Sequence, residues 1–120
     1  MTNLQNDLIL VGATGRLGSS ILKTNSISYG ICSSENPRQG KKIDNLSHPL
    51  LGSFLEIPKN NLKNPVVIDA SYPENLSNVY EFCLSNKTPL VLASTGHSPE
   101  QMDTLKSLSE DVAVLHLSLI

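Results

Sequence analysis

Short apolar runs separate longer segments in which apolar and polar residues repeat with a helical period. The first such run is Leu8 to Val11. A run without polar residues indicates a strand that is buried on both faces, as in a parallel sheet. We therefore expect strands at residues 8–11, 27–32, 66–69, 89–93 and 112–117.

Helices are expected at residues 15–23, 71–87 and 98–108, where apolar side chains repeat at helical spacing. Ser71 is placed to cap the second of these helices, with Pro73 in its first turn. Ser98 and Gln101 form the pattern of a capping box at the start of the third. The side chains of this third helix that are expected to point inward are Met102, Leu105 and Leu108.

Strands and helices alternate along almost the whole chain. This alternation calls for a parallel sheet with right-handed crossovers and helices on both faces. Residues 43–64 contain many polar and helix-breaking residues, so only a short strand at 53–57 is expected there. The sequence therefore predicts an α/β fold, a Rossmann-like doubly wound parallel sheet, formed by residues 1–120 as a single domain.

Three glycines follow the first strand at three-residue spacing: Gly12, Gly15 and Gly18. In a dinucleotide site the first glycine turns the backbone, the second lets a pyrophosphate approach the backbone amides, and the third lets the helix lie close to the strand. The phosphate then lies at the N-terminus of that helix. The spacing differs from the better-known G-x-G-x-x-G and also occurs for purely structural reasons, but the flanking strand and helix favour a nucleotide site.

The residues after the second strand bear on the cofactor. Ligands of open parallel sheets bind outside the carboxyl ends of the strands, where an acidic residue accepts hydrogen bonds from the adenosine ribose. Glu35 is the nearest carboxylate to that place, although a solvated loop glutamate has the same pattern. Arg38, Lys41 and Lys42 either meet the 2′-phosphate of NADPH or form an ordinary charged surface. The choice between NADH and NADPH therefore stays open.

The residues after the expected strand at 89–93 offer hydroxyl and backbone groups. Ser94, Thr95 and Gly96 suit hydrogen bonding to a ribose or a carboxamide. The same tract is equally typical of a capped turn between a strand and a helix. Both interpretations are kept.

Composition narrows the classes of function. A formal net charge of −2 provides no basic field for nucleic acid, and no apolar run has transmembrane length. The first seven residues lack the regions of a signal peptide, so we expect a cytoplasmic protein. Cys32 and Cys83 are expected to be buried free thiols, and no metal site is expected because the histidines share no ligand spacing.

The sequence contains the runs VGATGRLG at 11–18, VVIDASYPE at 66–74 and LVLASTGHS at 90–98. Together these runs resemble the nucleotide-binding domain of the 4-hydroxy-tetrahydrodipicolinate reductase family, also called dihydrodipicolinate reductase. The resemblance covers nearly the whole chain. It implies hydride transfer from NADH or NADPH to a cyclic dicarboxylate in diaminopimelate and lysine biosynthesis. Two positions depart from the family pattern, since Ala93 replaces a glycine and His97 an aromatic residue.

The resemblance also implies which residues bind the cofactor. Ala93, Ser94 and Thr95 match a Gly-Thr-Thr tract that lines the nicotinamide, and Ser34 or Glu35 lies at the adenosine ribose. The pyrophosphate is held by Gly12, Ala13, Thr14, Gly15, Arg16 and Leu17.

In this family the proton donor and the substrate contacts come from a second domain with a His-His-x-x-Lys motif, and the sequence contains no His-His pair. We therefore expect a cofactor-binding half without catalytic residues, which binds NAD(P)H weakly, reduces nothing alone and forms oligomers only through the second domain. Two alternatives are a short-chain dehydrogenase relative, whose Tyr-x-x-x-Lys pair is missing, and a non-catalytic module that senses a dinucleotide and reports to a partner.

Overall fold

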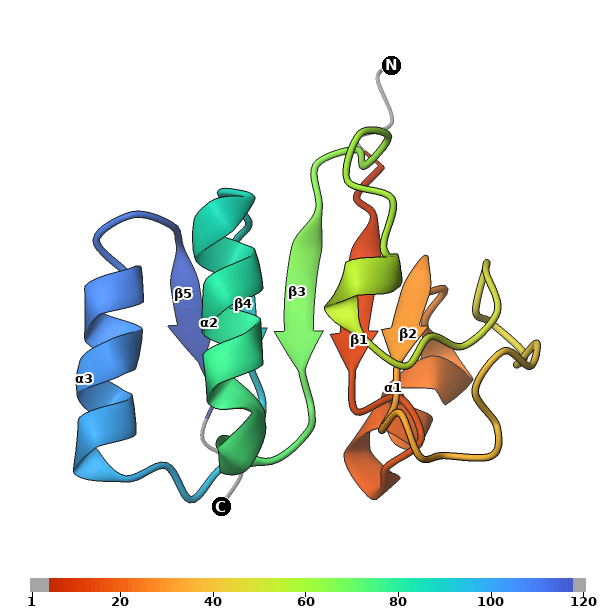
Figure 1. Cartoon of the computed structure of the whole chain (residues 1–120), viewed down its shortest axis with the longest axis horizontal. Helices are drawn as coiled ribbons and strands as arrows, with labels where there is room; N and C mark the ends of the chain where they lie inside the picture. Colours follow the sequence, from red (N-terminus) through yellow and green to blue (C-terminus); the bar gives the residue numbers. More distant parts are fainter. Residues whose placement is uncertain (1–4, 118–120) are drawn as a thin grey trace.

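Five parallel strands form the centre of the structure, a computed structural model that describes residues 5–117 (Figure 1). The strands are β1 (Leu8–Val11), β2 (Tyr29–Ile31), β3 (Val66–Asp69), β4 (Leu90–Leu92) and β5 (Val114–His116). They lie in the order β2-β1-β3-β4-β5, and each neighbouring pair is parallel. The predicted Rossmann-like α/β fold is confirmed.

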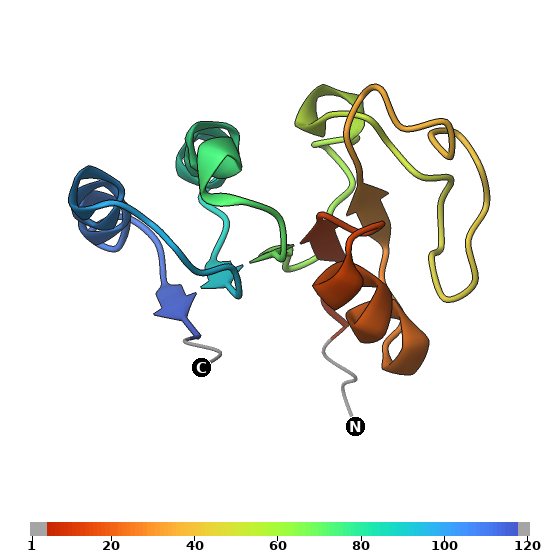
Figure 2. The same cartoon turned by 90° about the horizontal axis from the view of Figure 1, so that it is seen from below.

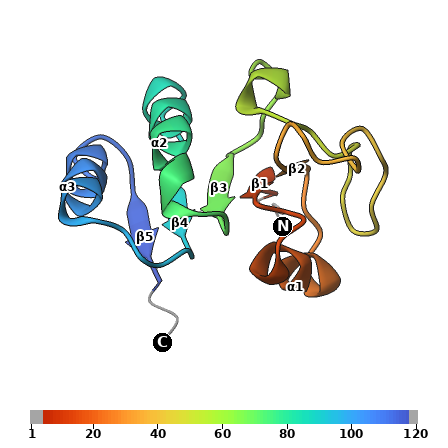
Figure 3. The same ribbon diagram turned by 60° about the horizontal axis from the view of Figure 1, so that its bottom comes forward.

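Helices cover the two faces of this sheet unequally. α1 (Arg16–Thr24) lies on one face, and α2 (Leu76–Ser85) and α3 (Pro99–Leu108) lie on the other (Figure 2, Figure 3). Crossovers between parallel strands are right-handed, and the step from β1 to β2 runs opposite to the steps from β3 to β5. The helices of these steps therefore lie on opposite faces, and the winding reverses between β1 and β3.

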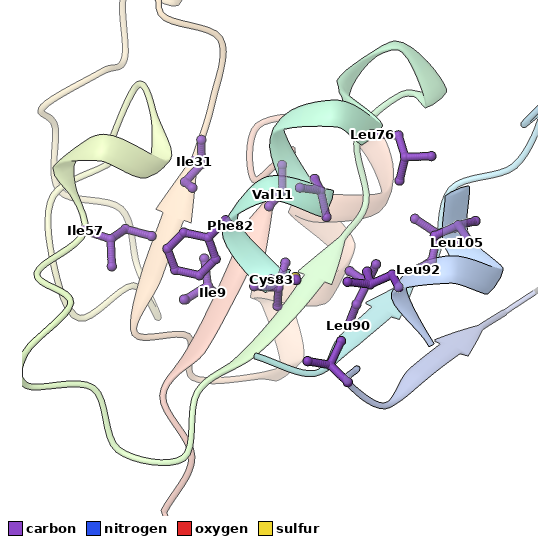
Figure 4. Packing of buried hydrophobic residues seen from close by; sticks show 14 of the residues in the cluster. Ile9, Val11, Ile31, Ile57, Leu76, Phe82, Cys83, Leu90, Leu92 and Leu105 are labelled. Atoms are coloured by element: carbon purple, nitrogen blue, oxygen red, sulfur yellow. The ribbon is translucent and has the colours of Figure 1, made fainter. Parts of the chain in front are cut away.

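Side chains of the strands alternate between two apolar clusters, one on each face of the sheet. Ile9 and Val11 belong to the larger cluster with residues of α2 and α3 (Figure 4), and Leu10 belongs to the cluster under α1. In the larger cluster Phe82 stacks on Phe54 with ring centroids 4.6 Å apart. Because β1 is buried on both faces, it must be apolar at every position.

The expected strand at residues 53–57 is wrong, because Phe54–Glu56 form a 3₁₀ helix, η1. Ser53 Oγ accepts a hydrogen bond from the Leu55 amide at 2.9 Å, and the Glu56 carboxylate accepts one from the Ser53 amide at 3.2 Å. The Ser-x-x-Glu sequence is thus a capping box, which outweighs the strand tendency of the apolar residues.

The second helix begins later than predicted. A 3₁₀ helix, η2 (Pro73–Asn75), precedes α2, and its N-cap residue Tyr72 makes no side-chain cap bond. The Ser71 hydroxyl does not cap the helix, because it donates to Asp69 Oδ1 at 2.5 Å. A strong local acceptor therefore diverts the residue that the sequence pattern assigns to the cap.

The third helix begins as predicted. The Gln101 amide donates to Ser98 Oγ at 3.2 Å, and the Ser98 amide donates to Gln101 Oε1 at 2.8 Å. Leu105 and Leu108 are buried, but Met102 is 42% exposed, so its expected inward placement is wrong. β1 and β3 have the expected bounds, whereas β2, β4 and β5 are shorter than expected. Before β2, for example, Ile27 forms only an isolated bridge with Leu46.

Cys32 and Cys83 are buried free thiols, as predicted, and burial raises the pKa of Cys83 to about 12. Within residues 5–117, no helix has the length and apolar character needed to cross a membrane. The same residues contain no cluster of His, Cys, Asp and Glu suited to a metal ion. Residues 1–4, on which the signal-peptide expectation partly rests, lie outside the described residues.

Candidate dinucleotide site

The turn between β1 and α1 needs glycine at its first and third glycine positions. Gly12 has a φ of +81°, in the left-handed region, and a Cβ there would lie 2.8 Å from the Ala70 carbonyl oxygen. A Cβ at Gly18 would overlap the Gly12 carbonyl oxygen, so Gly18 lets α1 pack directly on the turn. The predicted structural roles of these two glycines are confirmed.

Gly15 differs from the other two glycines. Its backbone is extended, with φ −75° and ψ 177°, and a Cβ there would meet only the Gly12 carbonyl oxygen, at 3.4 Å. That distance is an ordinary van der Waals contact, so the described fold accepts a side chain at this position. Gly15 instead lines a cleft, where the missing side chain leaves the first turn of α1 accessible.

The N-terminus of α1 offers backbone donors to this cleft. Among the described residues no side chain caps α1 at Gly15, and amides in the first turn of a helix have no acceptor within the helix. The amides of Gly12 and Ala13 are occupied, since they donate to the Ile31 carbonyl oxygen at 2.9 and 3.1 Å. The Gly15 amide is also occupied, since it donates to the Gly12 carbonyl oxygen at 3.1 Å. The donors left for an anion therefore include those of the first turn, at Arg16 and Leu17, where the helix dipole is positive.

The cleft has a volume of about 1160 Å³ and lies at the carboxyl ends of β1, β2 and β3. Its walls come from the β1–α1 turn, the loop after β2, η1 and one side of α2. The Asn36 side-chain amide donates to Thr14 Oγ1 at 3.3 Å and so joins the loop after β2 to the glycine turn. The volume is slightly above the range of about 300–1,000 Å³ usual for small-molecule sites, which suits an extended ligand.

Most residues predicted to hold the pyrophosphate and the ribose come together in this cleft. Ala13 is buried beneath the turn, and Glu35 is exposed and outside the described lining. Arg38, Lys41 and Lys42 are also exposed and outside this lining. The predicted residues that line the cleft are Gly12, Thr14, Gly15, Arg16, Leu17 and Ser34.

A second polar cluster lies at the ends of β3 and β4. Asp69 and Ser94 are 0% and 6% exposed. Asp69 Oδ1 accepts hydrogen bonds from the Ser71 amide at 2.9 Å and from the Ser71 hydroxyl, whereas Oδ2 has no partner among the described residues. Ser94 Oγ and both ring nitrogens of His97 are likewise buried without a partner there. Buried polar atoms are normally hydrogen-bonded, so these atoms indicate where a ligand or ordered water completes the bonding.

Burial shifts the pKa values in this polar cluster toward the neutral forms. It raises the pKa of Asp69, against the hydrogen bonds from Ser71 that lower it. Burial also lowers the pKa of His97, as does His116, whose ring meets the His97 ring edge-on at 5.6 Å between centroids. Both shifts favour neutral groups, which donate as well as accept hydrogen bonds. Of the other two residues predicted at the nicotinamide, Ala93 is buried and Thr95 is exposed.

Many lining residues are not singled out by the sequence pattern, among them Asn36, Lys59 and Tyr72. The Asn36 bond to Thr14 spans 22 residues of sequence, so no local spacing predicts it. Lys59 lies in a polar run typical of a surface loop, and Tyr72 is 71% exposed although it borders the cleft. A long-range fold is needed before any of these residues can be assigned to the site.

The parallel sheet and the glycine-rich turn after its first strand define the class of protein, a Rossmann-like α/β domain. Within that class, the family model described as "Dihydrodipicolinate reductase, N-terminus" matches residues 6–118. The chain belongs to this family, which confirms the resemblance drawn from its three sequence runs.

Individual relatives agree with the family match. The chain is 29% identical over 109 residues to the 4-hydroxy-tetrahydrodipicolinate reductase of Clostridium novyi, a match that covers 91% of this chain and 42% of the relative. The enzyme of that name from Clostridium tetani is 27% identical, over 89% of this chain and 40% of its own length. The enzyme from Alkaliphilus oremlandii is 29% identical, over 91% of this chain and 39% of its own length. The chain thus spans about two fifths of the length of the curated relatives it matches.

Proposed function

We propose that this chain binds NADH or NADPH at the carboxyl ends of its strands, as the cofactor-binding part of a reductase. The observation that carries the proposal is Gly15. It is the one turn glycine whose side-chain position the described fold leaves free, and it lines the cleft at the uncapped N-terminus of α1. When bound, the dinucleotide supplies a hydride for reduction.

The diphosphate is assigned to the start of α1. Thr14, Gly15, Arg16 and Leu17 line the cleft at this point, and the first-turn amides and the positive end of the helix dipole favour an anion. The exposed Arg16 guanidinium adds a positive charge there. Gly12 and Ala13 contribute in a different way, because their amides tie the turn to β2 through Ile31 and so fix the shape of the cradle.

The strand order supports a particular orientation of the bound dinucleotide along the edge of the sheet. Ligands of open parallel sheets bind where the winding reverses, which in this chain is between β1 and β3. The adenosine then extends toward β2 and the residues Ser34 and Glu35. The nicotinamide extends toward β4 and the residues Ala93, Ser94 and Thr95. A carboxamide has the donors and the acceptor that the unpartnered Asp69 Oδ2 and Ser94 Oγ require.

We further infer that the cofactor serves the reduction of a cyclic dicarboxylate in diaminopimelate and lysine biosynthesis, as the names of the relatives suggest. None of the described residues is assigned as the proton donor of that reaction. The chain is therefore expected to bind the cofactor without turning over a substrate by itself. Reductase activity of the purified 120-residue chain, measured as NADH or NADPH oxidation, would contradict this inference.

Calorimetric titration of the purified chain tests the binding proposal. NADH or NADPH is expected to bind at one site per chain, and ADP-ribose, which keeps the diphosphate, is expected to compete. Nicotinamide mononucleotide is the matched control, because it keeps the nicotinamide but lacks the diphosphate, and it is expected to bind far more weakly. Failure of both dinucleotides to bind at millimolar concentration would refute the proposal.

A further inference from the structure

The loop that follows β2 (Figure 1) is held in place by Asn36, a half-buried residue that lines the cleft. Its amide donates to the Ser33 carbonyl oxygen at 2.9 Å, and its carbonyl oxygen accepts from the Gln39 amide at 3.1 Å. Its side-chain oxygen accepts from the Arg38 amide at 2.9 Å, and its side-chain nitrogen donates to Thr14 Oγ1 at 3.3 Å. Both backbone groups and both polar side-chain atoms of Asn36 are thus hydrogen-bonded, which fixes its orientation.

This arrangement leaves the nearest carboxylate outside the cleft. Asn36 occupies the place that faces the glycine turn, whereas Glu35, one residue earlier, is exposed and does not line the cleft. The lining residues directly after β2 are Cys32, Ser33 and Ser34, which carry no carboxylate. In Rossmann-like sites an acidic residue near this place hydrogen-bonds to the ribose 2′-hydroxyl of NAD. Among the described residues, the group that would select NADH is therefore missing from this part of the cleft.

The charge that acts at the end of β2 is positive instead. Burial raises the pKa of the Cys32 thiol, and the positive charge of Arg38 acts in the opposite direction. Arg38 thus acts electrostatically on a residue that lines the cleft. Glu56 also acts on this thiol, but its carboxylate accepts hydrogen bonds from the Gly52 and Ser53 amides at 2.8 and 3.2 Å. The backbone therefore occupies this carboxylate, and the Arg38 guanidinium supplies the charge that acts on a ligand here.

We propose that Asn36 makes this chain prefer NADPH over NADH, because it fixes the loop after β2 with Arg38 toward the adenosine ribose and Glu35 outside the cleft. The inference rests on the proposed dinucleotide function. The 2′-phosphate of NADPH carries a charge of about −1.5 to −2 at pH 7, and a guanidinium binds phosphate through charge-assisted hydrogen bonds. Asn36 is a positioning residue, since it bonds the Arg38 amide on one side and Thr14 of the glycine turn on the other.

The ratio of the dissociation constants of NADH and NADPH, measured by calorimetry on the 120-residue chain, tests this inference. The wild type is expected to bind NADPH about tenfold more tightly at low salt, and added salt is expected to reduce this advantage. Arg38→Gln is expected to lose most of the advantage, because it weakens the binding of NADPH and not that of NADH. The matched control is Lys42→Gln, since Lys42 Nζ donates to the Ser47 carbonyl oxygen at 3.1 Å. This control is expected to keep the wild-type ratio.

Asn36→Asp separates a role in cofactor preference from a purely structural one. Aspartate keeps the acceptor for the Arg38 amide, loses the donor to Thr14 and places a carboxylate beside the ribose. The ratio is expected to fall about tenfold or more, so that NADH is no longer the weaker ligand. A purely structural role would weaken the binding of both dinucleotides alike and leave the ratio unchanged, which overturns the inference. An equal change of the ratio in Glu35→Gln also overturns it, because the preference would then depend on the residue outside the cleft.

The two levels of the account fail in different ways. A wild-type chain that binds NADH as tightly as NADPH overturns the inference about Asn36 and leaves the proposed dinucleotide function in place. A chain that binds neither dinucleotide refutes the proposed function and this inference together. Thermal unfolding of each variant shows whether it is folded, and Arg38→Gln carries the test if Asn36→Asp does not fold, because the Arg38 side chain is exposed.

Discussion

Replacing Gly15 with alanine is expected to affect the stability of the fold and the affinity for the dinucleotide in opposite directions. The backbone at Gly15 is extended, and the new methyl group would make only an ordinary contact with the Gly12 carbonyl oxygen, at 3.4 Å. An alanine that fits its backbone stabilises by about 0.4–1 kcal/mol, because the unfolded chain loses freedom. For a domain of this size the change raises Tm by roughly 2–6 °C.

The same methyl group enters the cleft in front of the first-turn amides. Hydrogen bonds to charged groups contribute about 1.5–3 kcal/mol each, and the methyl group displaces a phosphate from at least one of these amides. We therefore expect Gly15→Ala to bind NADH about tenfold more weakly or worse, because about 1.4 kcal/mol corresponds to a factor of ten. Thermal unfolding and calorimetric titration of the same preparation measure the two effects.

Gly12→Ala is the contrasting variant. The left-handed φ of +81° costs an alanine about 1–2 kcal/mol, and the clash with Ala70 adds to that loss, so Tm is expected to fall. Wild-type affinity in a folded Gly15→Ala variant would refute the placement of the diphosphate. A large loss of stability in that variant would refute the claim that the fold itself does not require this glycine.

Three further predictions concern individual side chains. Arg16→Gln is expected to weaken NADH binding about three- to tenfold and to reduce the salt dependence of that binding, which titrations at several salt concentrations measure. Lys23→Gln, at the far end of α1, is the control and is expected to leave both quantities unchanged. The wild-type protein is expected to bind NADH up to about tenfold more tightly than the 3-acetylpyridine analogue of NADH, which lacks the amide N–H donors. If the ratio of these two affinities is the same in Asp69→Asn as in the wild type, the Asp69 carboxyl does not bind the carboxamide. Because burial lowers the pKa of folded His97 below its ordinary value of 6.5, the unfolded chain binds a proton first as the pH falls through 6.5, and stability decreases. Urea unfolding at several pH values is expected to show a smaller acid loss in His97→Gln than in the wild type.

The parallel sheet was predictable because its signal is local and repeated. A strand buried on both faces must be apolar at every position, and β1 shows this in four consecutive residues. The cap of α3 was predictable for a similar reason, since Ser98 and Gln101 satisfy each other within one turn. Such features need no knowledge of distant contacts.

The errors arise where distant or competing partners decide the outcome. Phe54 stacks on Phe82 of α2, and the Ser53 capping box closes locally, so an apolar segment that resembles a strand forms a 3₁₀ helix. The Ser71 hydroxyl is likewise taken by Asp69 instead of capping the helix. Neither preference is visible in the periodicity of the sequence.

The glycine turn and the separate roles of its glycines were predictable, because the three-residue spacing follows directly on a buried strand. The described fold adds the contacts, since a Cβ at Gly12 or Gly18 would meet backbone atoms at 3.0 Å or less whereas Gly15 leaves space in the cleft. The occupied amides of Gly12 and Ala13 are invisible in sequence, because their acceptor, Ile31, belongs to another strand. The polar cluster around Asp69 and His97 required the pairing of β3 with β4.

The most direct test of the account is a map of backbone amide shifts during titration of the labelled chain with NADH. Saturable shifts that are largest at Gly15, Arg16 and Leu17, and that ADP-ribose reproduces, are the predicted result. Amides of the first turn of α1 that stay unchanged at saturating dinucleotide, or shifts confined to the opposite ends of the strands, would contradict it.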